Sequence, residues 1–190
     1  MKLVLASSSP RRSELLAAIG IVPDQIIAPD VDETPRKGEV PWEYSKRIAI
    51  LKARTVHEAV KDAYVLAADT IVERNRKIIL KAEDDEEARQ ILKAHSGRRQ
   101  RVFTSVCVIS PTGKEACRTV KTRLSFKRLT AEEIEEYVVL REWEGKSGAY
   151  DIRGMAAKFV KFMSGSQTNV IGLPLYETDC LLKGLGFSKK

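Results

Sequence analysis

The sequence predicts an α/β fold built on a mixed β-sheet. Short apolar runs that suit buried strands alternate with helical segments through the first half of the chain, and a β-hairpin occupies the second half. The chain has 190 residues, of which 43% are hydrophobic and 31% charged, a composition typical of globular proteins. We therefore expect a single domain over residues 1–190, large enough to bury a core.

The first predicted element is a buried strand in the apolar run Leu3–Ala6. Ser9 followed by Pro10 is typical of a helix N-cap and first helical position, and Gly20 marks the end of that helix. Residues 26–28 are apolar and predict a second strand. A strand, a helix and a second strand in succession indicate the start of a sheet that has a helix packed on it.

A longer helix is expected to open at Pro41. Residues 64–68 then predict a third strand, which is apolar on both faces and therefore central in the sheet. We expect this strand to end at Asp69. Asp84 is a helix N-cap residue and opens a helix that runs to about Ala94.

The second half begins with the hairpin. Side chains alternate along residues 102–109 and again along residues 120–126, with a turn sequence at residues 111–113 between them. Thr130 starts a capping box and so a further helix, and a last helix follows Pro174 after a Gly-rich segment.

The chain has an excess of positive charge, which indicates either an anionic partner or a basic surface exposed to solvent. With 33 Lys and Arg against 26 Asp and Glu, the formal net charge is +7. The Arg-rich residues 97–101 and the Lys189–Lys190 tail could favour nucleic acid. Because the sequence has no recognisable nucleic-acid module and no aromatic residues among these charges, we expect an anionic small molecule instead.

The cysteine count bears on the cell compartment and on metal binding. Cys107, Cys117 and Cys180 are odd in number and stand at unrelated spacings, which argues against a disulfide scaffold and a zinc site and fits a reducing cytoplasm. No apolar run approaches the roughly 20 residues of a membrane-spanning helix, and the N-terminal apolar run is too short for a secretory signal. We therefore expect a cytoplasmic protein without a membrane partner.

The segment that follows the first strand is a candidate anion site. Ser7, Ser8 and Ser9 offer hydroxyl groups, a helix N-terminus offers free backbone N–H groups, and Arg11 and Arg12 offer fixed positive charges. Together they would form a phosphate cradle without glycines. The alternative is an ordinary capped helix with exposed arginines.

Two groups of carboxylates are the second candidate. Asp30, Asp32 and Glu33 share a loop bounded by prolines, an arrangement that suits Mg²⁺ but also a solvated acidic turn. Asp69 follows an apolar strand, where open α/β sheets place their ligands, although it could be a turn cap. A carboxylate at that place needs a cation nearby to offset its desolvation.

Taken together, these segments resemble the Maf family of nucleotide pyrophosphatases, within the Maf/Ham1-like superfamily. The resemblance spans nearly the whole chain, and it rests on the order and spacing of many short pieces. These pieces are residues 5–16, Val31-Asp32-Glu33, Lys52-Ala53, residues 68–72, Lys81, Ser96-Gly97-Arg98, Val102, Thr104, Gly148-Ala149-Tyr150, Gly154 and residues 169–175.

The resemblance implies hydrolysis of nucleoside triphosphates at the α–β phosphoanhydride bond with a divalent metal, Mg²⁺ or Mn²⁺. It also implies an elongated mixed β-sheet flanked by helices, two lobes around a central cleft, and a homodimer. The residues it assigns fall into three groups: Ser7, Ser9, Arg12, Lys52 and Lys81 would bind the triphosphate; Glu33 and Asp69 would hold the metal; and Asp69 would be the catalytic residue, acting as general base or as metal ligand.

Substrate choice depends on three further positions. The branch that acts on dTTP and UTP carries an arginine, a threonine and a glutamine, and this chain has Arg11, Thr70 and Arg153. Glutamine can donate to and accept from a base edge, whereas arginine only donates and cannot accept the N3–H of uracil or thymine. Either a backbone carbonyl accepts that proton, or Arg153 turns towards phosphate, or the base preference differs. Arginine also pairs with the O6/N7 edge of guanine.

From the sequence we therefore expect a cytoplasmic, Mg²⁺-dependent pyrophosphatase that acts on dTTP and UTP, with modified pyrimidine nucleotides as a wider substrate range, and that cleans the nucleotide pool. One alternative is the same reaction on another base, such as 7-methyl-GTP, another purine nucleotide or a cytosine nucleotide. A second alternative is a nucleotide-binding cell-division regulator with little turnover. A basic nucleic-acid binder is the third and would show steeply salt-dependent affinity.

Overall fold

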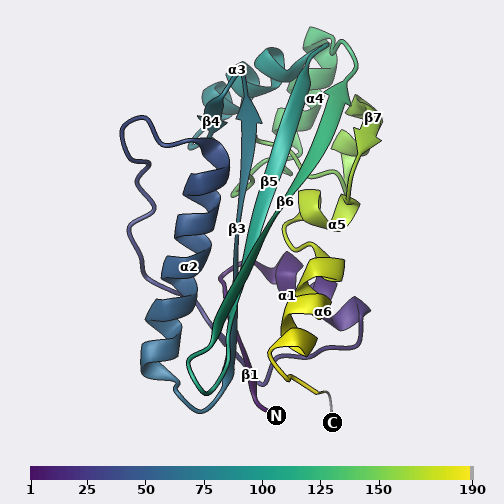
Figure 1. Ribbon diagram of the computed structural model, residues 1–190. Coiled ribbons are helices and arrows are strands. Elements are labelled where there is room, and N and C mark those ends of the chain that lie inside the picture. The colour runs from purple at the N-terminus through teal and green to yellow at the C-terminus, as the bar shows by residue number, and fades with distance from the viewer. Residues whose placement is uncertain (189–190) are drawn as a thin grey trace.

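The computed structural model describes residues 1–188 and confirms the predicted α/β class (Figure 1). Lys189 and Lys190, the basic tail noted in the sequence, lie outside the described residues. The strands are β1 (Leu3–Ala6), β2 (Gln25–Ile27), β3 (Tyr64–Arg74), β4 (Lys77–Ile79), β5 (Arg99–Ile109), β6 (Glu115–Phe126) and β7 (Val160–Ser164). The helices are α1 (Pro10–Ala18), α2 (Pro41–Ala59), α3 (Asp85–His95), α4 (Ala131–Val139), the short 3₁₀ helix η1 (Met155–Phe159), α5 (Gln167–Ile171) and α6 (Leu175–Gly184).

The strands form one mixed sheet in the order β2-β1-β3-β5-β6-β7, with β4 added to β3. β1 pairs in parallel with β2 and β3, whereas the other neighbours are antiparallel. β3, β5 and β6 are the long strands that run the length of the molecule (Figure 1).

One edge of β3 carries a gap between two partners. β1 pairs with residues 64–67 of β3, and β4 pairs with residues 72–74, whereas β5 covers the opposite edge through residues 65–73. Residues 68–71 therefore have no strand beside them on the β1 side. A gap of this kind leaves both faces of the sheet within reach of a ligand.

Helices cover the two faces of the sheet. α2 packs on one face, where Ala49 and Ala53 contact Ala67 and its neighbours, and α1 and α6 pack on the other, where Leu16 and Leu181 lie against Leu66. A separate core lies at the far end of the long strands beneath α3, α4 and η1 (Figure 1). The cores thus form at the two ends of the long strands, and the gap in β3 lies between them.

Several predicted elements are confirmed at their ends. Asp84 caps α3 by accepting a hydrogen bond from the backbone of Glu87, and Thr130 forms the expected capping box with Glu133. Ser9 is the N-cap of α1, but its side chain makes no capping hydrogen bond.

Other expectations were wrong. The third strand does not end at Asp69 but continues to Arg74, because β5 pairs with it as far as Glu73 and β4 pairs with residues 72–74. The Gly-rich segment between α4 and α6 contains η1, β7 and α5, elements that were not predicted from the sequence. None of the helices within residues 1–188 has the length and apolar composition needed to cross a membrane.

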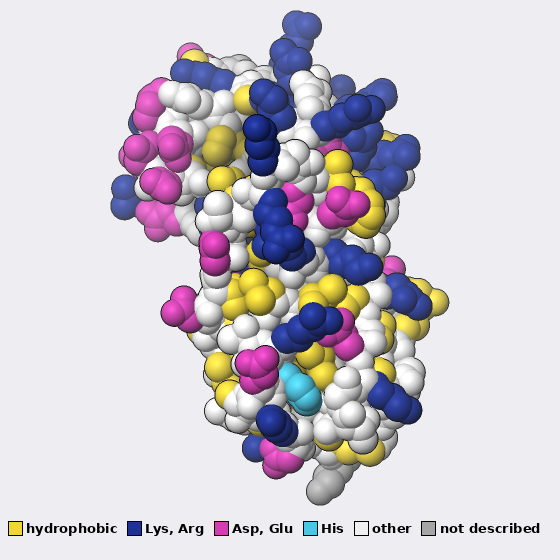
Figure 2. All heavy atoms as spheres, turned by 60° about the vertical axis from the view of Figure 1, so that its left-hand side comes forward, with side chains coloured by type: hydrophobic (Ala, Val, Ile, Leu, Met, Phe, Trp, Pro, Cys, Tyr) yellow, Lys and Arg dark blue, Asp and Glu magenta, His cyan; other side chains and the backbone are white. Residues whose placement is uncertain are grey.

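The basic residues are not all in one place. Exposed Arg99, Arg101, Lys121 and Arg123 lie on β5 and β6, and Lys and Arg side chains gather in the upper half of the molecule in Figure 2. Arg101 and Arg123 are directly opposite each other, although Arg101 also pairs with Glu73 at 2.9 Å. Part of the positive charge is therefore an exposed surface on the sheet.

Candidate active site

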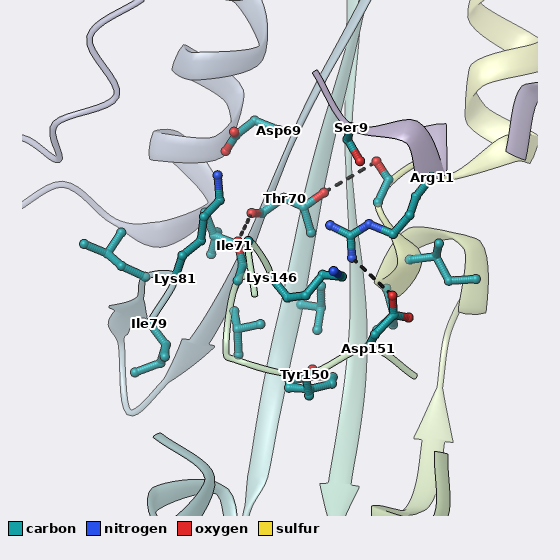
Figure 3. A pocket seen from close by; sticks show the side chains of 18 of the residues that line it. Ser9, Arg11, Asp69, Thr70, Ile71, Ile79, Lys81, Lys146, Tyr150 and Asp151 are labelled. Atoms are coloured by element: carbon teal, nitrogen blue, oxygen red, sulfur yellow. Dashed lines mark hydrogen bonds and ion pairs between the residues drawn. The ribbon is translucent and has the colours of Figure 1, made fainter. Parts of the chain in front are cut away.

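A large cleft opens where β3 has no neighbour, and it has a volume of about 1080 Å³. It collects segments that are far apart in sequence (Figure 3). Its walls are formed by residues 8–12, 33–35, 69–72, 79–83, 144–147, 150–153 and 170–172, together with Tyr44, Lys52 and Val102.

One lysine joins the two predicted carboxylates. The Nζ atom of Lys52 lies 2.9 Å from Oδ1 of Asp69 and 2.8 Å from Oε1 of Glu33. Lys52 reaches them from the buried face of α2, one turn after the fully buried Ile48. The Glu33 loop is tied to the same helix, because the hydroxyl of Tyr44 donates to the Glu33 carbonyl at 2.8 Å.

The second carboxylate oxygen of Asp69, Oδ2, differs from the other oxygens of this group in its hydrogen bonding. Asp69 is only 5% exposed, and its Oδ2 atom is buried without a hydrogen-bond partner among residues 1–188. A buried carboxylate oxygen in this state is costly unless a donor or a cation completes it. Oxygen ligands from one or two carboxylates are what Mg²⁺ takes from proteins, so Asp69 and Glu33 fit such an ion chemically.

Arg12 provides a buried positive charge on the other face of the sheet. Its Nε donates to the Gly172 carbonyl at 2.9 Å, and its terminal nitrogens donate to the hydroxyls of Ser7 at 3.0 Å and Thr70 at 3.4 Å. These partners are all neutral. Burial lowers the pKa of Arg12 to about 10, with the Asp69 charge acting in the opposite direction. Arg12 thus stays protonated at neutral pH, and an anion bound in the cleft would pair with its positive charge.

The serines of the predicted cradle have different positions. Ser8, Ser9 and Arg11 line the cleft at the start of α1, but Ser7 is buried and lies outside the lining. The Ser7 hydroxyl accepts hydrogen bonds from Arg12 and from the backbone N–H of Ser9. The structure therefore places Ser7 behind the wall, where it orients Arg12.

Arg153 is held by carboxylates at the rim. Its guanidinium donates to both oxygens of Asp151, at 3.2 and 3.0 Å, and to Glu14 at 2.7 Å. Nη1 of Arg11 lies 3.8 Å from Oδ2 of the same carboxylate (Figure 3). Burial raises the pKa of Asp151, but the hydrogen bonds from Arg153 outweigh this effect and the net pKa is lowered. Asp151 is thus an ionised acceptor between two arginines.

Two lysines line the cleft beyond β4. Lys81 was predicted; it is exposed, forms a bridge with Ser147, and points towards Asp69 in Figure 3. Lys146 was missed by the sequence reasoning. Burial and then the nearby Arg11 lower its pKa, as expected for a lysine facing another cation. Its place two residues before the Gly148-Ala149-Tyr150 piece was the signal that could have identified it.

The late glycine-containing segments have structural partners. Asn169 donates to the Val102 carbonyl and to the Thr122 hydroxyl, which fastens the segment that carries Gly172 to β5 and β6. Gly148 has a φ of +75°, and a Cβ there would lie 2.7 Å from a methyl group of Val72. Only glycine suits that position.

Known proteins resemble this chain over nearly its whole length. Residues 2–185 match the family described as "Maf-like protein". This chain belongs to the Maf family. Among the similar curated proteins, a dTTP/UTP pyrophosphatase of Rhodospirillum rubrum is 49% identical over 97% of this chain and 88% of its own length. Another, of Sphingopyxis alaskensis, is 50% identical over 97% of this chain and 96% of its own length.

A solved structure supports the fold of this Maf chain. The structure of a HAM1 protein from Coxiella burnetii matches it with a TM-score of 0.50, at 17% identity, over 68% of this chain and 74% of its own. The expected family and the mixed sheet flanked by helices are therefore confirmed. The roles given to individual residues of this Maf chain stay predictions.

Proposed function

We propose that this Maf-family chain hydrolyses the α–β phosphoanhydride bond of dTTP and UTP, releasing the monophosphate and pyrophosphate. The observation that carries the proposal is the unpartnered Oδ2 of Asp69, which lies beside Glu33 and Lys52 in a cleft lined by further cations. The names of the similar curated proteins support the same reaction.

The positive groups would position the triphosphate. Arg12, Lys52 and Lys81 line the cleft from both faces of β3 and the loop after β4. Phosphoryl chemistry needs positioning and charge stabilisation more than covalent catalysis, and these side chains supply both. The negative charge that develops on the departing pyrophosphate would fall among them.

Asp69 would act on the attacking water. Its Oδ1 is held by Lys52, so Oδ2 is free to accept the proton as the water oxygen bonds to the α-phosphorus and the bond to the bridging oxygen breaks. Glu33 and Asp69 would hold Mg²⁺ or Mn²⁺, which when bound supplies neutralisation of phosphate charge.

Asp151 and Arg11 would bind the base. Uracil and thymine present an N3–H donor beside carbonyl acceptors, and this pair offers an ionised acceptor beside a guanidinium donor. Arg153 donates to Asp151 and Glu14 instead. We infer that Asp151 supplies the acceptor that arginine cannot supply at position 153.

A product-resolved assay tests the proposal. The purified chain is incubated with Mg²⁺ and each common ribo- and deoxyribonucleoside triphosphate, adding 5-methyl-UTP, pseudo-UTP and 7-methyl-GTP. Monophosphate plus pyrophosphate from UTP and dTTP is the expected result. The same products from a purine or cytosine nucleotide alone would overturn the base assignment, and binding without turnover would favour the regulator. The proposal includes a homodimer and a cytoplasmic location, which size measurement and fractionation test.

A further inference from the structure

Two of the three cysteines face each other across the hairpin. Cys107 of β5 is directly opposite Cys117 of β6, and their Sγ atoms lie 2.6 Å apart. Opposite residues of an antiparallel pair have Cα atoms roughly 4.5–5.5 Å apart, which falls within the range of about 4.4–6.8 Å that a disulfide spans. A covalent link between these sulfurs therefore needs no movement of the backbone.

The surroundings give the two thiols different access. Cys107 is fully buried beneath α2, in the same cluster as Ala49 and Ala53, whereas Cys117 is only partly buried at the margin of that cluster. A reagent in solution can therefore reach Cys117 first, and Cys107 can react only with a group already attached to Cys117.

We propose that Cys107 and Cys117 form a reversible cross-strand disulfide by exchange with a low-molecular-weight disulfide such as oxidised glutathione. The Cys117 thiolate attacks one sulfur of oxidised glutathione, forms a mixed disulfide and releases one glutathione thiolate. Cys107 then attacks the Cys117 sulfur and its proton leaves with the second glutathione as a thiol. The two cysteines are oxidised, and one oxidised glutathione is reduced to two molecules of glutathione.

The electrostatic surroundings support this order of events. The hydrogen bond between the two sulfurs lowers the pKa of Cys117; burial and Glu115 oppose this effect, and the charges of Lys46 and Arg54 add to it. The same hydrogen bond and burial raise the pKa of Cys107. Because the thiolate is the nucleophile, Cys117 attacks and Cys107 resolves the mixed disulfide.

A metal site is the competing interpretation of the same residues. Cys107, Glu115 and Cys117 form a group with close ligand atoms. However, sulfurs about 2.3 Å from a tetrahedral zinc lie well over 3 Å from each other, and these lie 2.6 Å apart. The Glu115 carboxylate is also held through both oxygens by Arg54, at 2.7 and 3.1 Å. The geometry therefore favours the disulfide.

The experiment uses the reduced full chain in glutathione buffers with a rising share of the oxidised form. Intact mass and peptide mapping follow the products at each step. The expected result for the native chain and for Cys180→Ser is a loss of two hydrogens and a Cys107–Cys117 link. Cys107→Ser is expected to stop at a glutathione adduct on Cys117, whereas Cys117→Ser forms neither the adduct at this site nor the link.

Three outcomes would overturn the inference. They are a glutathione adduct on Cys117 of the native chain that never resolves, a link that involves Cys180, and zinc binding to the reduced chain that is lost in Cys117→Ser and blocks oxidation. Cys107→Ala serves as a second variant in case serine is not tolerated at the buried position. Because Cys117 is partly exposed, Cys117→Ser keeps the test valid even if both changes at Cys107 prevent folding.

Discussion

Asp151 binds the guanidinium of Arg153 through both carboxylate oxygens, with distances of 3.2 Å from Nε and 3.0 Å from Nη2. The backbone N–H of Arg153 also donates to Asp151, at 3.0 Å. The side chain of residue 153 is therefore directed by the residue two positions before it. The two residues would therefore play different parts. Asp151 would accept a hydrogen bond from the base, whereas Arg153 would donate to Asp151 and Glu14.

Replacing Asp151 should change substrate preference more than replacing Arg153. Asp151→Ala removes the acceptor for the N3–H of uracil, so kcat/KM for UTP is expected to fall about tenfold or more relative to CTP. Arg153→Gln, the matched change, should leave the ratio of UTP to CTP hydrolysis nearly unchanged. Steady-state kinetics with both nucleotides checks this, and a larger loss of UTP selectivity in Arg153→Gln would contradict it.

Asp69→Asn should abolish most turnover and preserve the fold. The amide keeps the shape of the side chain but cannot take a proton, and loss of a general base typically costs about 10²–10⁴-fold in rate. Product assays together with thermal unfolding and nucleotide binding measure the two effects separately. Asp62→Asn is the control, because exposed Asp62 lies in the turn between α2 and β3 and does not line the cleft. Near-normal turnover by folded Asp69→Asn would remove Asp69 from the mechanism.

Lys52→Gln should make the stability of the protein depend on divalent metal. The change leaves the buried Asp69 and its neighbour Glu33 without their shared cation. Breaking a buried ion pair costs about 3–5 kcal/mol, and Mg²⁺ can replace the missing charge. Thermal unfolding with EDTA and with Mg²⁺ should show a larger metal-induced rise in Tm for the variant. Equal rises in the two proteins would argue against a metal at these carboxylates.

Lys146→Gln tests the residue that sequence reasoning missed. Lys146 faces the cleft beside Arg11, and its lowered pKa reflects burial near that cation. Removing one charge-assisted contact should raise KM for the triphosphate about tenfold, with a smaller effect on kcat. The exposed Lys121 on β6, which does not line the cleft, provides a matched Lys→Gln control. A KM equal to that of the native chain would exclude Lys146 from substrate binding.

His95 should make the protein less stable in mild acid. It is buried and its Nε2 lies 3.1 Å from the Gly148 carbonyl, and burial lowers its pKa from 6.5 to about 4. Below pH 6.5 the unfolded chain binds a proton that the folded chain refuses until about pH 4, so stability falls as pH falls through this window. The loss from pH 7 to 5 is about 2 kcal/mol.

Urea unfolding of the native chain and of His95→Gln at several pH values measures this contribution. Glutamine can still donate to Gly148 but does not titrate. The free energy of unfolding of the variant should therefore depend less steeply on pH between 6.5 and 4. Equal slopes would show that His95 is not the group responsible.

Local sequence signals were enough to predict the helices whose ends are set by their own residues. Asp84 and Thr130 were recognised because a cap needs only the three residues that follow it. The end of β3 was placed too early because Asp69 and Thr70 are polar. Their strand continues because β5 and, further on, β4 pair with it, and nothing near Asp69 in the sequence reports the pairing with β5.

The site contains contacts that no local pattern reports. Glu14 meets Arg153 across 139 positions, and Gly172 meets Arg12 across 160. The cysteines differ, because their spacing was judged unrelated although a hairpin turning at residues 111–113 brings Cys107 to Cys117. That pairing could have been derived from the hairpin prediction.

The gap in the edge of β3 has an evolutionary consequence. Side chains alternate along a strand, so Asp69 points to the α2 face with Lys52 and Thr70 points to the opposite face with Arg12. Neighbours in the sequence thus serve two separate surfaces that one nucleotide would touch at the same time. With the roles proposed above, a change on the Thr70 face would alter base preference while Asp69 and Lys52 on the α2 face stay unchanged, so one scaffold could diversify its substrates without rebuilding its chemistry.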